Sequence, residues 1–232
     1  MIAYVITRNL SSRGGSQRVC VSTSRVLKEV GFRIRLVTKT PVSWPQVHSW
    51  EGGGRIGFDE VVDLEPIRVG AFGRYQKFLA FLPLLGHAPD ILVNTSGDFF
   101  PFLYCAGTAA NICYCHFPVV RLMARQDAPE KYSGRLWRAY YAPYRALLNR
   151  AIARATSRTI FLTNSRFSKE AIKEHLGVDA RVLYPPVAVE RFQAVAKSDR
   201  RKDKVVTVAR FNPSKKIDLI FDILPRLRAD VE

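Results

Sequence analysis

The sequence has few acidic residues for the number of its basic ones, and no long hydrophobic run. Its 20 aspartates and glutamates face 36 lysines and arginines, which gives a formal net charge of +16 over 232 residues. An excess of this size predicts an anionic partner: nucleic acid, a membrane surface or a phosphate-bearing small molecule. The length allows one large domain, or one domain and part of another.

Segments that would place the chain in or across a membrane are also missing. The longest apolar stretch, FLAFLPLLG at 78–86, contains a proline and is about half of the roughly 18 residues that span a bilayer. The first residues, MIAYVITRN, lack the basic segment that opens a signal peptide. We therefore expect a cytoplasmic protein that lies peripherally at the membrane.

Cysteines are scarce as well: the chain has Cys20, Cys105, Cys113 and Cys115. Three of them lie in or beside strongly apolar segments, which predicts free, buried thiols in a reducing compartment. The motif CYCH at 113–116 has no second ligand pair at zinc spacing, and no Asp-x-Asp motif is present. We therefore expect a buried strand there rather than a metal site, and no cofactor.

What the sequence does have is a regular alternation of β-branched runs and helical patterns. This alternation predicts an α/β fold with a Rossmann-like parallel sheet and helices on both of its faces. Strands are expected at 2–6, 33–38, 60–64, 90–95, 111–116, 159–164, 181–185 and 204–209. Helices are expected at 15–30, 74–85, 134–157 and 165–176.

Ligands of such sheets bind at the carboxyl ends of the strands, so the residues directly after each strand are the candidates for a site. After the first strand, Gly14 and Gly15 free the backbone for close approach at the start of a helix, although paired glycines also make simple turns. Asp98 comes after the fourth strand and His116 after the fifth. The alternatives are that Asp98 is a helix N-cap and that His116 is a strand-end histidine with its hydrogen bonds satisfied.

The longest helical pattern, 134–157, combines aromatic residues with arginines. One stripe at helical spacing contains Trp137, Tyr141, Tyr144, Leu148, Ile152 and Ala155. Arg150, Arg154 and Arg158 fall on the opposite side, and Pro143 is expected to kink or divide the helix. Residues 121–158 hold nine basic residues against two acidic ones. The segment is either a core helix with a solvated basic face or a surface for anionic lipid headgroups.

A boundary between domains is expected near the end of the chain. YPPVAVERF at 184–192 is followed by a highly charged run, which is typical of a linker. We predict an acceptor-binding, Rossmann-like domain at 1–187, a linker at 188–203, and the first strand and helix of a second, truncated Rossmann-like domain at 204–232.

Five motifs together resemble a known family. In chain order they are GGSQRV, CHFP, LTNSRFSKEAIKEHLG, VLYPPVAVERF and VARFNPSKKIDLI. This order resembles the retaining nucleotide-sugar glycosyltransferases of the GT-B architecture, of the group-1 or family-4 type. CHFP and YPPV are most similar to the branch that adds mannose to lipid-linked oligosaccharides. The resemblance implies an N-terminal domain for the acceptor and a C-terminal domain for the donor nucleotide.

The resemblance implies roles for particular residues of the first domain. His116 matches the histidine that reaches the transferred sugar, so it is the catalytic candidate. Gly14 and Gly15 match the loop that approaches the acceptor and the donor diphosphate. Asp98 and Arg18 are candidates on the acceptor side of the site.

Near the end of the chain, Arg210 and Lys215 resemble the pair that holds the donor diphosphate. Fixed cations there would stabilise the charge that gathers on the departing diphosphate. Lys216 stands where the family usually has glycine, so it either crowds the turn or shares the diphosphate role. Ala188 stands where an aspartate is common, which leaves the role of that aspartate unfilled.

The implied function is transfer of a sugar, with retention, from a nucleotide-diphosphate sugar to a lipid-linked or glycan acceptor, with GDP-mannose as the favoured donor. The family's paired glutamates for the donor sugar have no counterpart, so we expect the 232 residues alone to be inactive. The chain would then be a shortened polypeptide, half of a split enzyme or a remnant. The alternative is a non-catalytic basic Rossmann-like module that binds anionic membranes or phosphate ligands. We expect no nucleic-acid partner, because no such motif is present.

Overall fold

The computed structural model describes most of the chain. The described residues are 1–11, 14–45, 47, 57–64, 73–119, 134–187, 204–209, 215–223, 225 and 230–231. The chain divides into two compact units, Met1–Pro186 and Val187–Glu232, and each has its own secondary structure.

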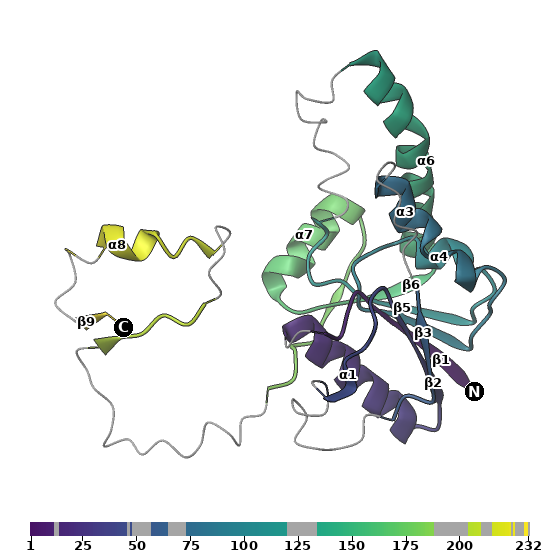
Figure 1. Cartoon of the computed structure of the whole chain (residues 1–232), viewed down its shortest axis with the longest axis horizontal. Helices are drawn as coiled ribbons and strands as arrows, with labels where there is room; N and C mark the ends of the chain where they lie inside the picture. Colours follow the sequence, from purple (N-terminus) through teal and green to yellow (C-terminus); the bar gives the residue numbers. More distant parts are fainter. Residues whose placement is uncertain are drawn as a thin grey trace. The chain divides into compact units, whose positions relative to one another are not determined.

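The first unit is built on a seven-stranded parallel sheet (Figure 1). Its strands are β1 (Ile2–Thr7), β2 (Arg33–Thr38), β3 (Glu60–Asp63), β4 (Ile91–Asn94), β5 (Ala110–Tyr114), β6 (Thr159–Thr163) and β7 (Arg181–Val182). Its helices are α1 (Gly15–Glu29), α3 (Gly73–Leu79), the 3-10 turn η1 (Leu82–Leu84), α4 (Pro101–Tyr104), α6 (Arg135–Arg158) and α7 (Arg166–Leu176). Each of these strands was expected from the sequence, and the structure shortens several of them at their ends.

The order of the strands is β3-β2-β1-β4-β5-β6-β7. From β1 the chain goes to β2 on one side, and from β4 it goes to β5 on the other side. The strand order thus reverses between β1 and β4, and this switch point at the carboxyl edge of the sheet is where ligands of doubly wound folds bind. The predicted Rossmann-like α/β fold is confirmed.

Alternation along the central strands gives the sheet two buried faces. In β1, Ala3 and Val5 pack with Cys20 and Val21 of α1, while Tyr4 and Ile6 belong to the cluster on the other face. Because successive side chains of a strand point to opposite sides, a run such as IAYVI fits a strand that is covered on both faces. Helices do cover both faces, as the sequence predicted.

Helix α6 is buried along only part of its length. Its second half, taken from Tyr144 to the end, packs into the core through Tyr144, Leu148, Ala151, Ile152 and Ala155. Its first half is exposed except for Tyr140 and Tyr141, which are half-buried. The predicted core stripe is therefore wrong at its start, where 43% of Trp137 is exposed. The reason is geometric, since the start of α6 reaches beyond the sheet (Figure 1).

Pro143 lies inside α6 without dividing it, so of the two expected effects, a kink or a division, the division does not occur. Proline removes one helical hydrogen bond and crowds the preceding turn, so a continuous helix here is held by the packing of its second half. None of the helices that the structure describes is long and apolar enough to cross a membrane.

The second unit has two short parallel strands, β8 (Lys204–Val205) and β9 (Asp230–Val231), and the helix α8 (Leu219–Ile223). The strand expected at 204–209 is thus shorter, and β9 was not anticipated. The side chains of α8 are exposed or half-buried.

Candidate functional site

Most of the candidate residues in the first unit lie at the carboxyl edge of its sheet. Gly14, Gly15 and Arg18 come after β1, Asp98 after β4, and His116 after β5. Because β1, β4 and β5 are adjacent and parallel, their carboxyl ends share one edge. This is the arrangement that the sequence analysis expected for these residues.

The glycine pair opens α1 without being required by the backbone. Gly14 is the N-cap, with φ −165° and ψ 171°, an extended conformation that any residue adopts. A Cβ at Gly15 would contact nothing within 4 Å, and one at Gly14 would meet only the flexible side chain of Gln17. Among the described residues, nothing else lies within 4 Å of these two positions, and the first turn of α1 contains no acidic residue that would repel an anion.

Side-chain hydrogen bonds connect a residue after β1 with the first turn of α1. Gln17 Nε2 donates to Asn9 Oδ1 at 2.8 Å, and Ser16 Oγ donates to Gln17 Oε1 at 2.9 Å. Arg18, one residue further, is half-buried and continues the helix through its backbone bond to Gly14. Amides and hydroxyls thus surround the glycine pair.

Asp98 forms an ion pair with Lys39, a residue that the sequence analysis did not single out. Lys39 Nζ lies 2.6 Å from Asp98 Oδ2, and the two side chains are 15% and 18% exposed. Lys39 comes directly after β2, so the pair links the ends of β2 and β4. The alternative reading of Asp98 as a helix N-cap is wrong, because the N-cap of α4 is Phe100 and no side chain caps that helix.

His116 is half-buried at the end of β5, and its ring contacts the Tyr114 ring edge-to-face at 5.0 Å. Burial lowers the pKa of its imidazole, so the ring is neutral at pH 7. Within the described part of the chain, the buried Nε2 atom has no hydrogen-bond partner. The alternative of a fully satisfied histidine therefore does not hold for this atom.

The cysteines next to His116 are ordinary core residues. All four cysteines are free and buried, as predicted. Burial raises the pKa of Cys115 to about 12, and burial followed by the neighbouring Cys115 raises the pKa of Cys113. Thiols in this state are poor metal ligands, and the described residues contain no cluster that could hold a metal ion.

The candidates for donor diphosphate lie in the second unit. Arg210 falls outside the described residues. Lys215 and Lys216 are exposed, and Lys216 has φ +46°, in the left-handed region that glycine adopts without strain. The turn thus keeps a conformation suited to the glycine that the family usually has there.

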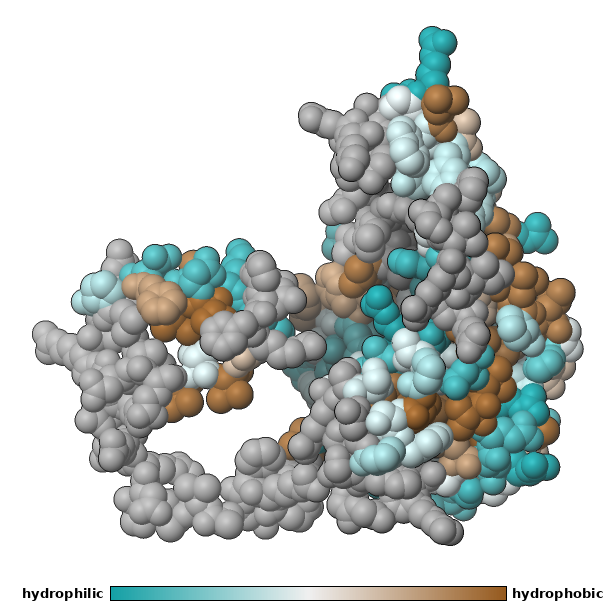
Figure 2. Space-filling model, viewed as in Figure 1, coloured by the Kyte–Doolittle hydropathy of each residue, from teal (hydrophilic) through white to brown (hydrophobic). Residues whose placement is uncertain are grey.

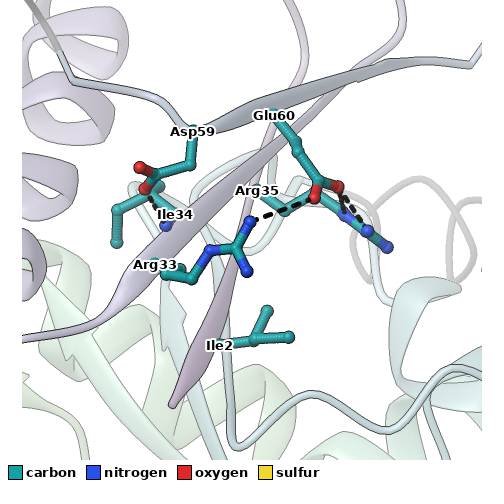
Figure 3. A pocket seen from close by; sticks show the side chains of 6 residues that line it. All are labelled: Ile2, Arg33, Ile34, Arg35, Asp59 and Glu60. Carbon is teal, nitrogen blue, oxygen red and sulfur yellow. Dashed lines mark hydrogen bonds and ion pairs between the residues drawn. The ribbon is translucent and has the colours of Figure 1, made fainter.

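A shallow pocket lies at the opposite, amino-terminal edge of the sheet (Figure 3). It is lined by Ile2, Arg33, Ile34, Arg35, Asp59 and Glu60. The Ile34 N–H, at 2.7 Å, and then Lys28 lower the pKa of Asp59, while Glu60 pairs with both arginines. These contacts tie the start of β3 to β2, so we assign them to the stability of the sheet.

Lys39 is the residue of the site that sequence reasoning missed. Sites are expected directly after strand ends, and this rule, used for the first, fourth and fifth strands, also selects Lys39 after the second strand. Among the described residues, no hydrogen bond or ion pair joins Asp98 to His116 or to the glycine pair. Asp98, His116 and the glycine pair thus lie at the same edge of the sheet without contacting one another through a hydrogen bond or ion pair.

Fold and site together define a doubly wound α/β protein with polar side chains after the strands on both sides of its switch point. Comparison with protein families assigns the chain further. Residues 13–191 match the profile of Glycosyltransferase Family 4, so the chain belongs to that family. Among curated proteins, none matches the chain.

Two solved structures are similar to this chain. An alpha-glucosyltransferase in complex with UDP is 14% identical with a TM-score of 0.46, over 98% of this chain and 55% of that one. TcCGT1 in complex with UDP is 14% identical with a TM-score of 0.43, over 95% of this chain and 55% of that one. The chain therefore spans about half the length of these structures.

Proposed function

We propose that this chain contributes the acceptor-binding portion of a retaining sugar transferase. The enzyme would move a sugar from a nucleotide-diphosphate sugar to a lipid-linked or glycan acceptor. The observation that carries the proposal is the gathering of Gly14, Gly15, Asp98 and His116 at the carboxyl edge of a family 4 fold. Mannose is the favoured sugar and GDP-mannose the favoured donor, from the resemblance of CHFP and YPPV to mannosyltransferases.

In the proposed reaction, the donor diphosphate is bound by residues from both units of the chain. Lys215, Lys216 and Arg210 would bind the donor diphosphate and stabilise the negative charge that it gains as it departs. The N-terminus of α1 behind Gly14 and Gly15 would add a favourable dipole. No metal ion or other cofactor is part of the proposal.

His116 would contact the sugar during its transfer. The ring is neutral because burial lowers its pKa, so one nitrogen can accept a hydrogen bond while the other donates one. The Nε2 atom has no partner in the described residues but is buried, so binding of a sugar hydroxyl would require a rearrangement that exposes it. A buried polar atom of this kind costs stability unless a ligand satisfies it.

Transfer is tested with radiolabelled GDP-mannose and UDP-sugars against lipid-linked oligosaccharides. The 232-residue chain is assayed alone and after mixing with polypeptides encoded next to it. We expect His116→Ala to lower turnover by about 100-fold. The control His87→Ala should leave turnover unchanged, since His87 lies before β4 and contacts Tyr4, away from the carboxyl edge of the sheet. Absence of transfer from every mixture would contradict the proposal.

A second candidate is a non-catalytic module that binds anionic membranes, and peripheral membrane binding is also compatible with the transferase. The exposed half of α6 supports it. Leu136 is 87% and Trp137 43% exposed there, between Arg135 and Arg138. Figure 2 shows polar and hydrophobic surface intermixed at this end of the helix. Aromatic rings and arginines together suit the interface of a membrane.

A further inference from the structure

The ion pair between Lys39 and Asp98 differs from the other ion pairs that join described residues. It is the one whose two side chains are both less than 20% exposed. Ions withdrawn from water to this degree recover their desolvation cost only with good geometry, so such a pair is weak evidence for a purely stabilising role. Its place at the carboxyl edge, beside the switch point, indicates a role in binding.

The carboxylate of Asp98 uses only one of its oxygens within the described residues. Oδ2 accepts from Lys39 at 2.6 Å, and no described residue donates to Oδ1. The Asp98 backbone is held at both ends, because its N–H donates to Ser96 Oγ at 3.2 Å and its carbonyl accepts from Asn94 Nδ2. A fixed carboxylate of this kind can accept a hydrogen bond from a ligand at Oδ1 without breaking an existing bond.

Lys39 is fixed on several sides. Its ammonium lies 4.4 Å from the centre of the Phe81 ring as well as against Asp98, and its backbone N–H donates to the Arg8 carbonyl at 3.3 Å. Phe81 is fully buried and its ring is therefore held in place, so it supports the ammonium group by a cation–π contact. Lys39 therefore sets the direction of the Asp98 carboxylate.

The charge of the pair restricts the class of ligand. Lys39 and Asp98 neutralise each other as a pair, so a ligand at Oδ1 meets a hydrogen-bond acceptor rather than a cation. An anion such as phosphate would be repelled by the carboxylate, whereas a hydroxyl donor would gain a charge-assisted hydrogen bond.

We propose that Asp98 Oδ1 anchors a hydroxyl group of a neutral acceptor sugar, and that Lys39 is the positioning residue that holds the carboxylate for it. The identity of the ligand as an acceptor rests on the proposed function. Asp98 binds and orients the acceptor by this hydrogen bond, while the diphosphate belongs to the cations of the second unit.

The test is a binding titration of the ¹⁵N-labelled 232-residue chain with simple probes. The probes are methyl α-D-mannopyranoside, methyl α-D-glucopyranoside, methyl N-acetyl-β-D-glucosaminide and inorganic phosphate. At least one glycoside is expected to bind in the millimolar range and to shift the Asp98 region of the spectrum. Asp98→Asn should weaken that binding by about tenfold, the loss typical of a hydrogen bond to a charged group.

The variants at Lys39 separate positioning from structure. Lys39→Met should weaken glycoside binding about as much as Asp98→Asn, while Lys39→Arg, which keeps the cation, should stay within about threefold of wild type. Lys28→Met is the matched control, since it removes the 3.1 Å ion pair with Asp59 at the other edge of the same sheet and should change nothing. Thermal denaturation shows which variants fold. If Asp98→Asn does not fold, the difference in glycoside binding between Lys39→Arg and Lys39→Met tests the proposal instead.

The proposal is overturned if no glycoside binds the wild type, if Asp98→Asn binds as the wild type does, or if phosphate binds at this place as tightly. These outcomes are distinct from failure of the transferase. If glycosides bind in a way that depends on Asp98 but no sugar is transferred, the proposed function is overturned, while the role of Asp98 in binding a sugar hydroxyl stands. If sugar is transferred and the acceptor KM of Asp98→Asn equals that of the wild type, the role of Asp98 in acceptor binding is overturned, while the transferase function stands.

Discussion

Burial sets the protonation states of several side chains near the carboxyl edge of the sheet. It raises the pKa of Cys20 and of Cys115 to about 12, so both thiols stay protonated at pH 7. Burial lowers the pKa of His116 in the same way, because a charged imidazole would lose its hydration there. The three side chains are therefore neutral at pH 7, whereas Lys39 and Asp98 form a charged pair at the same edge.

The lowered pKa of His116 predicts an acid-sensitive fold. The unfolded chain binds this proton near pH 6.5 and the folded chain only at lower pH, so stability is lost as the pH falls from above 6.5 through the folded pKa. We expect the melting temperature of the wild type to fall between pH 7.5 and 5.5 by more than that of His116→Gln.

The comparison with His116→Gln cancels the titration of the other histidines, which both proteins share, and the pH range keeps the carboxylates with lowered pKa values ionised. The pKa values of Asp59 and Asp179 are lowered by their hydrogen bonds from Ile34 and Lys169, so both remain ionised above pH 5. Equal changes of melting temperature in wild type and His116→Gln would show that His116 is not the linked group.

At the scale of elements, the two halves of the continuous helix α6 differ in how much tertiary packing stabilises them. Its second half is covered by the sheet and by α4, where Tyr144 contacts Phe100 at 5.8 Å between ring centroids. Its first half has an aromatic group of its own, in which Trp137 stacks on Tyr141 at 6.0 Å. Core packing therefore stabilises mainly the second half. The first half is held by α3, where the Tyr75 hydroxyl donates to the Tyr140 carbonyl at 2.6 Å, and by the continuity of the helix.

Two leucines of α6 measure this difference. Leu148 is 3% exposed, so Leu148→Ala should remove buried contacts, leave a cavity and lower the free energy of unfolding by about 2–5 kcal/mol. Leu136 is 87% exposed, and Leu136→Ala should change it by less than about 0.5 kcal/mol. Chemical denaturation of both variants is the measurement, and similar losses would contradict the exposure of the first half.

Pro143 gives a second prediction on the same helix. It is exposed inside a continuous helix, where proline costs up to about 3 kcal/mol relative to alanine. Pro143→Ala should restore the bond from the residue 143 N–H to the Ala139 carbonyl and stabilise the unit by about 1–3 kcal/mol. A lower melting temperature in this variant would show that the proline shapes the path of α6 toward a contact that the straight helix loses.

At the scale of the whole molecule, the net charge of +16 is distributed unevenly. Helix α6 contains six arginines and no acidic residue, and five of the six are exposed. The apolar segment 78–86, which also suggested a membrane surface, lies largely in the core through Phe81 and Leu84, with Leu82 and Leu85 exposed. The argument for membrane binding therefore rests on α6.

Flotation with lipid vesicles tests this argument. We expect the chain to bind vesicles that contain phosphatidylserine, and to bind less as the salt concentration rises, because screening shortens the reach of surface charge. Replacing Arg135 and Arg138 by glutamine should lower binding by about tenfold or more, at about 1 kcal/mol per charge near the surface. The matched pair Arg150→Gln and Arg158→Gln, in the packed half, should have little effect.

Equal binding to neutral and anionic vesicles would contradict the electrostatic account. Equal loss in both arginine pairs would instead assign binding to the total charge of α6 rather than to its exposed end.

Much of the fold and part of the site could be predicted from the sequence. Strands such as 2–6 and 33–38 are short β-branched runs between helical patterns, and that pattern alone implies parallel strands with helices on both faces. Once the strands are placed, Gly14, Asp98 and His116 must come after strand ends and share one edge. The sequence also predicted the buried thiols, since those cysteines lie within apolar runs.

Only the tertiary structure decided which residues meet and which side chains remain exposed. Lys39 and Asp98 are 59 residues apart, and their contact depends on the placement of β2 and β4 on either side of β1, which no local pattern encodes. The stripe on α6 has helical spacing throughout, yet only its second half is buried, because burial depends on where the sheet ends. Periodicity determines the face that a helix offers, and the neighbouring elements determine how much of that face is covered.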